Sequence, residues 1–189
     1  MTSAEAISLI ESNFRVASKT EFRGETTLVV ERDAFPALSS FCKKELGFDY
    51  LLDISSVDNF GVEPRFEMVY ELYSFDRGQH LRLKYPVSED EPVAPTVSGV
   101  WATANWHERE VYDMMGIKFA GHPDLRRILM WEGYPFHPLR KDFPLAGKPS
   151  EMPDVAFSNA APLAGGPFVT LPGCGTTKDR EPRSRSENL

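Results

Sequence analysis

The sequence has few cysteines, and this scarcity excludes several kinds of site. Its two cysteines, Cys42 and Cys174, stand far apart in 189 residues and belong to no CxxC pair. A cysteine-held zinc or iron–sulfur centre therefore has no support in the sequence, and neither has a disulfide framework. A reduced, cytoplasmic setting is the simplest interpretation.

The short motifs of nucleotide-binding and nucleophilic enzymes are also missing. The chain contains no GxGxxG loop, no GxxxxGK[ST] loop and no GxSxG elbow. The zinc motif HExxH fails as well, because Val111 stands where the second histidine after His107 and Glu108 would be. Neither a phosphate cradle nor an activated serine is therefore predicted.

Long apolar runs are absent too. No run approaches the roughly 18 residues that a membrane-spanning helix needs. The first fourteen residues lack the basic start and apolar centre of a signal peptide. We therefore expect no direct membrane span, and membrane association only through a partner. The formal net charge of −7 argues against a nucleic-acid partner.

The chain contains enough apolar residues to form a core, and their pattern is typical of an α+β protein. Apolar residues make up 41% of the chain. Thr2 and Glu5 have the spacing of a capping box at the start of a first helix. A strand is predicted over 26–31, and a second helix is predicted from a cap at Asp33 to a stop at Gly47.

Alternating residues then predict three strands. The first puts Phe48, Tyr50, Leu52 and Ile54 on one face. The next two form a hairpin over 66–87 with apolar residues on its inner face. Its outer face carries Glu67 and Glu71 on one strand and Arg82 and Lys84 on the other, so cross-strand ion pairs are expected.

A helix from about Val100 to Met115, ending at Gly116, completes the regular elements. A turn and short helix are predicted after Gly121, with Pro123 in the first helical turn. We therefore predict an α+β core over 1–145, with an antiparallel or mixed sheet flanked by helices. An extended, irregular, Pro/Gly-rich arm is predicted over 146–189.

Ionisable residues concentrate over 106–145, and two interpretations compete there. Glu110 and Asp113 are three apart and share a helix face, which suits either proton transfer or an ion-pair network in which Arg109 pairs with Asp113. The histidine spacing matches no zinc site. A stand-alone acid/base or metal enzyme using His107, Glu108, Glu110 and His122 is the less favoured alternative.

Arginines framed by prolines and aromatic residues favour a protein interface instead. We predict no catalytic, cofactor-binding or metal-binding residue in the chain. The predicted interface or structural charge network consists of Glu108, Arg109, Glu110, Asp113, His122, Asp124, Arg126, Arg127, Arg140, Lys141 and Asp142.

The same segment resembles a known family. The stretch "WHEREVYDMMGIKFAGHPDLRRILMWEGYPFHPLRKDFPL" contains ERE-x-[YF]-D, GI-x-F-x-GHPDLRRIL and PLRKD[FY]PL in order and at family spacing. These are the signature elements of the thirty-kilodalton-type, or C-type, subunit family of respiratory complex I, the proton-pumping NADH:quinone oxidoreductase. The resemblance covers roughly residues 1–147.

The resemblance implies a peripheral-arm subunit that carries no cofactor, with FMN and iron–sulfur clusters held by partner subunits. It implies a place beside the D-type subunit, which forms part of the quinone cavity, in a complex that uses NADH and quinone. The expected location is the cytoplasmic face of the cell inner membrane, peripheral and held through the complex. The equivalent subunit of a membrane-bound hydrogenase or another complex I-like enzyme is the alternative that shares the core motif.

Overall fold

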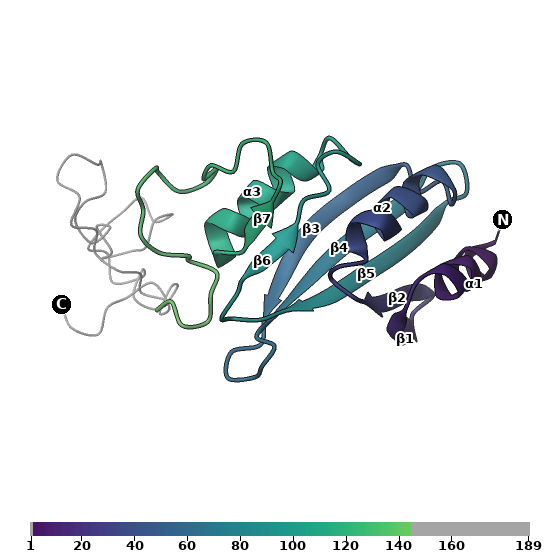
Figure 1. Cartoon of the computed structure of the whole chain (residues 1–189), viewed down its shortest axis with the longest axis horizontal. Helices are drawn as coiled ribbons and strands as arrows, with labels where there is room; N and C mark the ends of the chain where they lie inside the picture. The colour runs from purple at the N-terminus through teal and green to yellow at the C-terminus, as the bar shows by residue number, and fades with distance from the viewer. Residues whose placement is uncertain (1, 145–189) are drawn as a thin grey trace, which may run out of the picture. The chain divides into compact units, whose positions relative to one another are not determined.

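A computed structural model describes residues 2–144 of the chain (Figure 1). The chain divides into two units, Met1–Glu132 and Gly133–Leu189, of which the structure describes residues 2–132 and 133–144. The predicted arm over 146–189 lies outside the described residues. Among the described residues, no helix combines the length and the apolar character needed to cross a membrane.

The first unit is built on a mixed sheet of five strands in the order β1-β2-β5-β4-β3. The strands are β1 (Val16–Phe22), β2 (Glu25–Val30), β3 (Tyr50–Asp58), β4 (Phe66–Ser74) and β5 (Gln79–Val87). Neighbours are antiparallel except β2 and β5, which are parallel. A second, two-stranded parallel sheet joins β6 (Val93–Pro95) to β7 (Lys118–Ala120). The predicted class, α+β with a mixed sheet flanked by helices, is confirmed.

Three helices accompany the sheet: α1 (Ser3–Asn13), α2 (Phe35–Lys44) and α3 (Ala104–Met115). The predicted capping box is present in α1, where Thr2 and Glu5 each donate a backbone N–H to the other's side chain. The predicted cap of α2 by Asp33 is wrong. Ala34 holds that position without a side-chain bond, and the Asp33 carboxylate instead accepts from Arg32 Nε at 3.3 Å.

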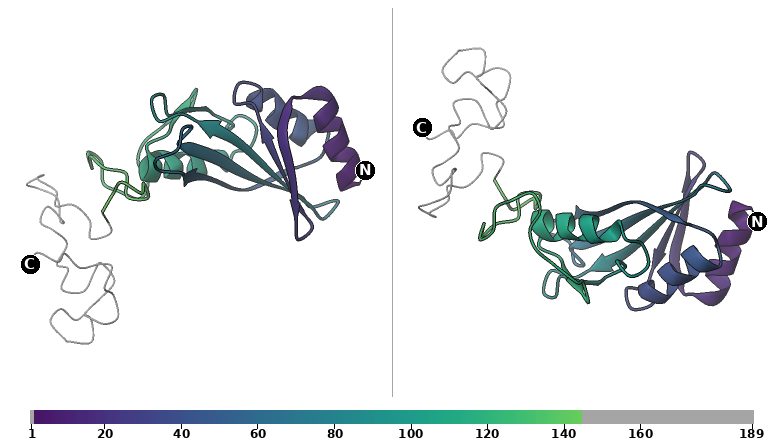
Figure 2. Two further views of the ribbon diagram at one scale, coloured as in Figure 1. Left: turned by 90° about the horizontal axis from the view of Figure 1, so that it is seen from below. Right: turned by 90° about the horizontal axis from the view of Figure 1, so that it is seen from above.

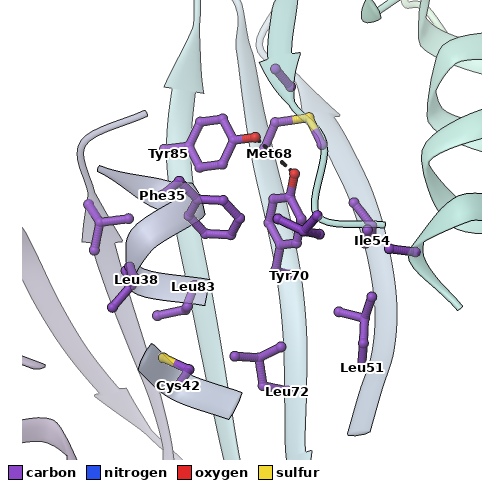
Figure 3. Packing of buried hydrophobic residues seen from close by; sticks show 14 of the residues in the cluster. Phe35, Leu38, Cys42, Leu51, Ile54, Met68, Tyr70, Leu72, Leu83 and Tyr85 are labelled. Atoms are coloured by element: carbon purple, nitrogen blue, oxygen red, sulfur yellow. Dashed lines mark hydrogen bonds between the residues drawn. The ribbon is translucent and has the colours of Figure 1, made fainter. Parts of the chain in front are cut away.

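The core lies on one face of the large sheet, where α2 and α3 both pack (Figures 1 and 2). The Phe35 ring of α2 lies 4.3 Å from the ring of Tyr70 and 4.7 Å from that of Tyr85, measured between centroids. Figure 3 shows this packing and the hydrogen bond of 2.8 Å that joins the two tyrosine hydroxyls. Helix α1 lies beside α2, with Phe14 against Phe41.

The predicted hairpin of β4 and β5 is confirmed, including its charged outer face. Glu71 lies directly opposite Arg82 and accepts a hydrogen bond from it. Lys84 reaches diagonally to Glu67 at 2.8 Å. Arg82 also pairs with Glu25 of β2 at 3.0 Å, so the ion pairs continue across the parallel seam.

The predicted buried face of β3 is confirmed for Ile54 but wrong for Tyr50 and Leu52. Leu51 and Ile54 are buried, whereas Tyr50 and Leu52 are exposed. The register with β4 shifts between Leu51 and Asp53, where a bulge adds one residue to β3. Because side chains alternate along a strand, one added residue moves every earlier side chain to the opposite face.

Candidate functional site

Helix α3 carries the first half of the charged segment, and six of its twelve residues are buried. The buried residues are Ala104, Glu108, Val111, Asp113, Met114 and Met115. The predicted end is confirmed, because Gly116 has φ +80°, a conformation that glycine adopts without steric penalty. The helix begins at Ala104 rather than near Val100. Before it, the N–H groups of Val100 and Trp101 both donate to the Val97 carbonyl and form turns.

Asp113 is fully buried and anchors the segment after β7. Its Oδ2 accepts three successive backbone N–H groups, those of Ile128, Leu129 and Met130, at 2.9, 2.7 and 2.8 Å. Its Oδ1 accepts from Arg127 Nη1 at 2.6 Å. Burial by itself would raise the pKa of Asp113, but these four donors outweigh it and hold that pKa below its ordinary value.

Arg109, one turn before Asp113 on α3, binds carbonyl groups of the same segment. Its guanidinium donates to the carbonyls of Arg126 and Arg127 at 3.0 and 3.2 Å. The predicted helical pair between Arg109 and Asp113 is therefore wrong in its geometry. Both side chains leave the helix surface to bind the backbone of the later segment. The Arg109 guanidinium also lies over the Trp106 ring, 5.2 Å from its centroid.

Residues 121–130, which we call the strap, follow β7 and are irregular. The short helix predicted there is wrong. A helix would bond the carbonyls of Arg126 and Arg127 and the N–H groups of 128–130 internally or leave them to solvent. Here, Arg109 and Asp113 of α3 satisfy those groups instead, so side chains of a distant element compete successfully with local structure.

Glu108 lies inside the protein, although its position in the charged segment suggested an interface. Its side chain is 0% exposed. Its carboxylate accepts from the Val97 N–H and from Thr96 Oγ1, both at 2.6 Å. Burial raises the pKa of Glu108 to about 7, while those two hydrogen bonds oppose the rise.

His122, at the start of the strap, lies next to Glu108. Its Nε2 lies 3.9 Å from Glu108 Oε2 and 3.2 Å from the Asn105 carbonyl. Its Nδ1 accepts the backbone N–H of Asp124 at 3.0 Å. A ring nitrogen that accepts carries no proton, so these bonds assign the proton to Nε2, which donates to Asn105.

The outer side of α3 and the strap presents a different set of residues to solvent. Trp106 is 60% exposed and Leu129 is 62% exposed. Arg126 is exposed as well, and its guanidinium binds both carboxylate oxygens of Asp124 at 2.7–3.0 Å. Glu110 is exposed on the same helix. We call Trp106, Arg126 and Leu129 the α3 surface. No pattern in the sequence indicated that Leu129 would be exposed, because it follows the apolar Ile128.

The predicted network members on α3 and the strap take different positions but are linked, because the Asp124 N–H donates to His122 and Arg109 donates to the Arg126 carbonyl. Asp113, Arg127 and Arg109 join α3 to the strap, Glu108 and His122 form a buried pair, and Asp124 and Arg126 form an exposed one. In the second unit, Arg140 Nε lies 3.2 Å from Asp142 Oδ1, and the Phe136 ring lies between those of Tyr134 and Phe143, at 5.6 and 6.0 Å. The predicted contact of Arg140 and Lys141 with the first group stays a prediction.

The acid–base interpretation gains little from this geometry. Glu110 and Asp113 share a helix face by spacing, but one is exposed and the other is buried with four donors on its oxygens. His107 Nδ1 lies 3.4 Å from Asp53 of β3, on a different part of the helix from the His122 pair. Within residues 2–144, no group of three or more His, Cys, Asp or Glu side chains could hold a metal ion.

Comparison with known proteins identifies the class to which this fold and segment belong. The sequence profile described as "Respiratory-chain NADH dehydrogenase, 30 Kd subunit" matches residues 28–149, more than half of the chain. The chain belongs to this family. The resemblance found in the sequence is thereby confirmed.

Individual relatives are named as the C-type subunit of NADH-quinone oxidoreductase. The protein of Geotalea uraniireducens is 52% identical over 131 residues, 69% of this chain and 80% of its own length. That of Geobacter sulfurreducens is 49% identical over 132 residues, 69% of this chain and 82% of its own length. In Rhizobium meliloti, a C-type subunit numbered 2 is 59% identical over 102 residues, 54% of this chain and 56% of its own length.

Two solved structures are similar in fold. The chain described as "Nqo5 of the trypsin-resistant fragment (1-134)" has a TM-score of 0.57 and 32% identity, covering 66% of this chain and all of that one. A chain of the membrane-bound sulfane sulfur reductase, described as an archaeal respiratory membrane complex, has a TM-score of 0.64 and 26% identity. It covers 75% of this chain and 86% of that one.

Proposed function

We propose that the chain is a cofactor-free, peripheral-arm subunit of an NADH:quinone oxidoreductase that docks the subunit bearing the quinone site. Electron transfer from NADH to quinone and coupled proton translocation belong to the assembled complex, whose partner subunits hold FMN and iron–sulfur clusters. The complex holds the chain at the cytoplasmic face of the inner membrane. Family membership and the relatives' names support the setting.

One observation carries the docking role. The strap has its backbone polar groups bonded from the inside by Arg109 and Asp113, while Trp106, Arg126 and Leu129 project outward. A rigid surface with exposed tryptophan and arginine has the composition of an interaction hot spot, because these residues provide large contact area with little conformational freedom to lose. The quinone-site subunit is the proposed partner of this surface.

A second candidate is the equivalent subunit of another complex I-like enzyme. The fold similarity to a chain of the membrane-bound sulfane sulfur reductase favours it. The identities of about 50% to C-type subunits of NADH-quinone oxidoreductase weigh against it. Purification from native membranes with identification of the co-purifying subunits distinguishes the two.

Replacing Trp106, Arg126 and Leu129 together by alanine is expected to leave the fold intact but weaken assembly. All three side chains are exposed, so the free energy of unfolding should change by less than about 1 kcal/mol. Loss of these three contact residues should reduce the amount of assembled complex about tenfold or more. Native gel electrophoresis of solubilised membranes measures that amount. Arg127 is left unchanged because it pairs with buried Asp113.

The matched control replaces Leu9, Arg15 and Phe22, two apolar residues and one arginine exposed elsewhere on the first unit. This control should assemble normally. In the α3 surface variant, the rate of quinone reduction in membranes should fall only in proportion to the amount of assembled complex. Normal assembly of the α3 surface variant with a specific loss of turnover would contradict docking and favour a catalytic role.

The isolated full-length chain is expected to be colourless and metal-free and to show no NADH oxidase activity. The cysteine scarcity and the missing phosphate loops are the reasons. Absorption spectra and metal analysis of the pure chain test this. A flavin or iron–sulfur spectrum, or near-stoichiometric metal, would favour the stand-alone enzyme instead.

A further inference from the structure

The loop between β3 and β4, residues 59–65, protrudes beyond the ends of these two strands (Figure 1). Two large apolar side chains stand at its tip. Phe60 is 58% exposed and Val62 is 62% exposed. Apolar residues that stand together on a protruding loop are unfavourable in water unless something covers them, and such patches mark interaction sites.

A buried arginine, Arg65, links the loop to the end of β3 and to the loop after β5. Arg65 is 1% exposed, and its guanidinium makes two bonds of 2.8 Å to Asp58 and one of 2.5 Å to Glu89. The same guanidinium lies against the rings of Phe60 and Phe66, 4.8 and 5.0 Å from their centroids. The Phe60 ring is therefore held by a cation–π contact with Arg65, although more than half of its surface is exposed.

Backbone bonds close the loop as well. The Asn59 N–H donates to the Arg65 carbonyl at 2.8 Å, and the Val62 N–H donates to the Asn59 carbonyl at 2.9 Å. A loop whose conformation is set before binding loses little entropy when a partner engages it. The tip thus has the property of a preorganised binding element rather than of a loosely tethered turn.

Acidic residues surround the tip. The neighbouring loop, residues 88–92, is bonded to Arg65 through Glu89. Over 58–65 and 88–92 the chain carries five acidic side chains and one basic one, Arg65. Glu63, Asp90 and Glu91 are exposed. A complementary surface would have an apolar pocket with a rim of lysine and arginine, because opposite charges steer encounter and fix orientation.

We propose that Phe60 and Val62 insert into an apolar pocket of a second protein, whose basic rim pairs with Glu63, Asp90 and Glu91. An anionic membrane surface would repel this acidic rim, and so would nucleic acid, which favours a protein partner. The contact is made by elements other than those of the α3 surface. It therefore goes beyond the proposed function and holds whether or not that function is correct.

Site-specific photo-crosslinking in native membranes tests the proposal. The full-length chain carries p-benzoyl-phenylalanine in place of Phe60 and, as a matched control, in place of the similarly exposed Phe22 of β1. The expected result is one discrete protein adduct from position 60, at least about tenfold above that from position 22, with lysine or arginine flanking the cross-linked site in the partner. No adduct above the control, or adducts to lipid alone, would overturn the proposal.

Charge reversal tests the basic rim separately. In the position 60 background, Glu63→Lys, Asp90→Lys and Glu91→Lys together should reduce the adduct about tenfold or more. Reversing the exposed Glu11, Glu21 and Asp33 is the control. If the charge-reversed variant unfolds at a lower urea concentration than the unmodified chain, a neutralised variant is used instead, with Glu63→Gln, Asp90→Asn and Glu91→Gln. A smaller reduction of the adduct is then expected. An unchanged adduct in a folded variant would refute the basic rim.

These outcomes are independent of the proposed function. If the chain does not co-purify with a quinone-reducing complex, the proposed function is wrong. The cross-link from position 60 still tests the loop contact in that case. A chain present in such a complex but giving no adduct from position 60 defeats the loop contact alone.

Discussion

Replacing Asp113 by asparagine is expected to lower the free energy of unfolding by about 3–5 kcal/mol, the typical loss when one member of a buried ion pair is removed. Both oxygens of Asp113 are in use: Oδ2 faces three backbone N–H groups and Oδ1 faces Arg127. An asparagine must turn its NH2 group toward one of these sets, so donors oppose donors. It also leaves the Arg127 charge without its anionic partner.

Urea unfolding of the full-length chain at neutral pH measures this loss. Asp124→Asn is the matched control, because Asp124 also binds an arginine but is exposed. That control should change the free energy of unfolding by well under about 1 kcal/mol. If the two variants lose the same stability, Asp113 is not the anchor of the strap.

The pH dependence of the Asp113 contribution has a definite sign. Its pKa in the folded chain lies below the ordinary value because the four donors favour the ionised form. The folded state therefore releases this proton more readily than the unfolded state. The stabilisation is fully present above the ordinary pKa of an aspartate and is lost as the pH falls through the folded pKa.

Glu108 is expected to behave in the opposite way. Burial raises its pKa in the folded chain to about 7 from an ordinary value of 4.5. Its contribution to stability is fully present below about pH 4.5, falls as the pH rises, and is lost above about pH 7. A pKa change of one unit corresponds to about 1.36 kcal/mol, so the free energy of unfolding falls by roughly 3 kcal/mol between these two pH values.

Glu108→Gln should remove this pH dependence, because glutamine stays neutral and can still accept from the Val97 N–H. Relative to the unmodified chain, the variant should gain stability between about pH 4.5 and pH 7, and the gain should level off at higher pH. His122, Tyr70 and Tyr85 surround the site and are unchanged in the variant. Glu110→Gln, exposed on the same helix, is the control. Parallel stability profiles for the chain and Glu108→Gln would contradict the pKa assignment.

The sequence predicted elements whose pattern is set by near neighbours. The hairpin of β4 and β5 is one, because strict alternation fixed both its buried face and the opposite charges of its outer face. The capping box at Thr2 and the stop at Gly116 are others, since each depends on residues within one helical turn.

The failures arise where a distant group decides the local structure. The strap has the local pattern of a helix, but Arg109 and Asp113 bind the backbone groups that the helix would need. The bulge in β3 leaves no mark in the alternation of apolar residues, and because of it Tyr50 and Leu52 are exposed although Ile54 is buried as predicted. For the candidate site, the density of charge drew attention to residues 106–145 but could not show that Glu108 is buried and Glu110 exposed. Which side of α3 is covered depends on distant residues such as Thr96 and Val97, which bind Glu108.

The parallel seam between β2 and β5 sets the order in which the chain can assemble. Strands β3, β4 and β5 follow one another and pair through short turns, whereas the seam joins Thr27 to Arg82, 55 residues later. Closing so long a loop costs more entropy than closing a turn. We therefore expect the β1–β2 hairpin and the β3–β4–β5 strands to form separately before β2 pairs with β5. During synthesis, the edge of β2 that pairs with β5 therefore has no partner strand until β5 has left the ribosome.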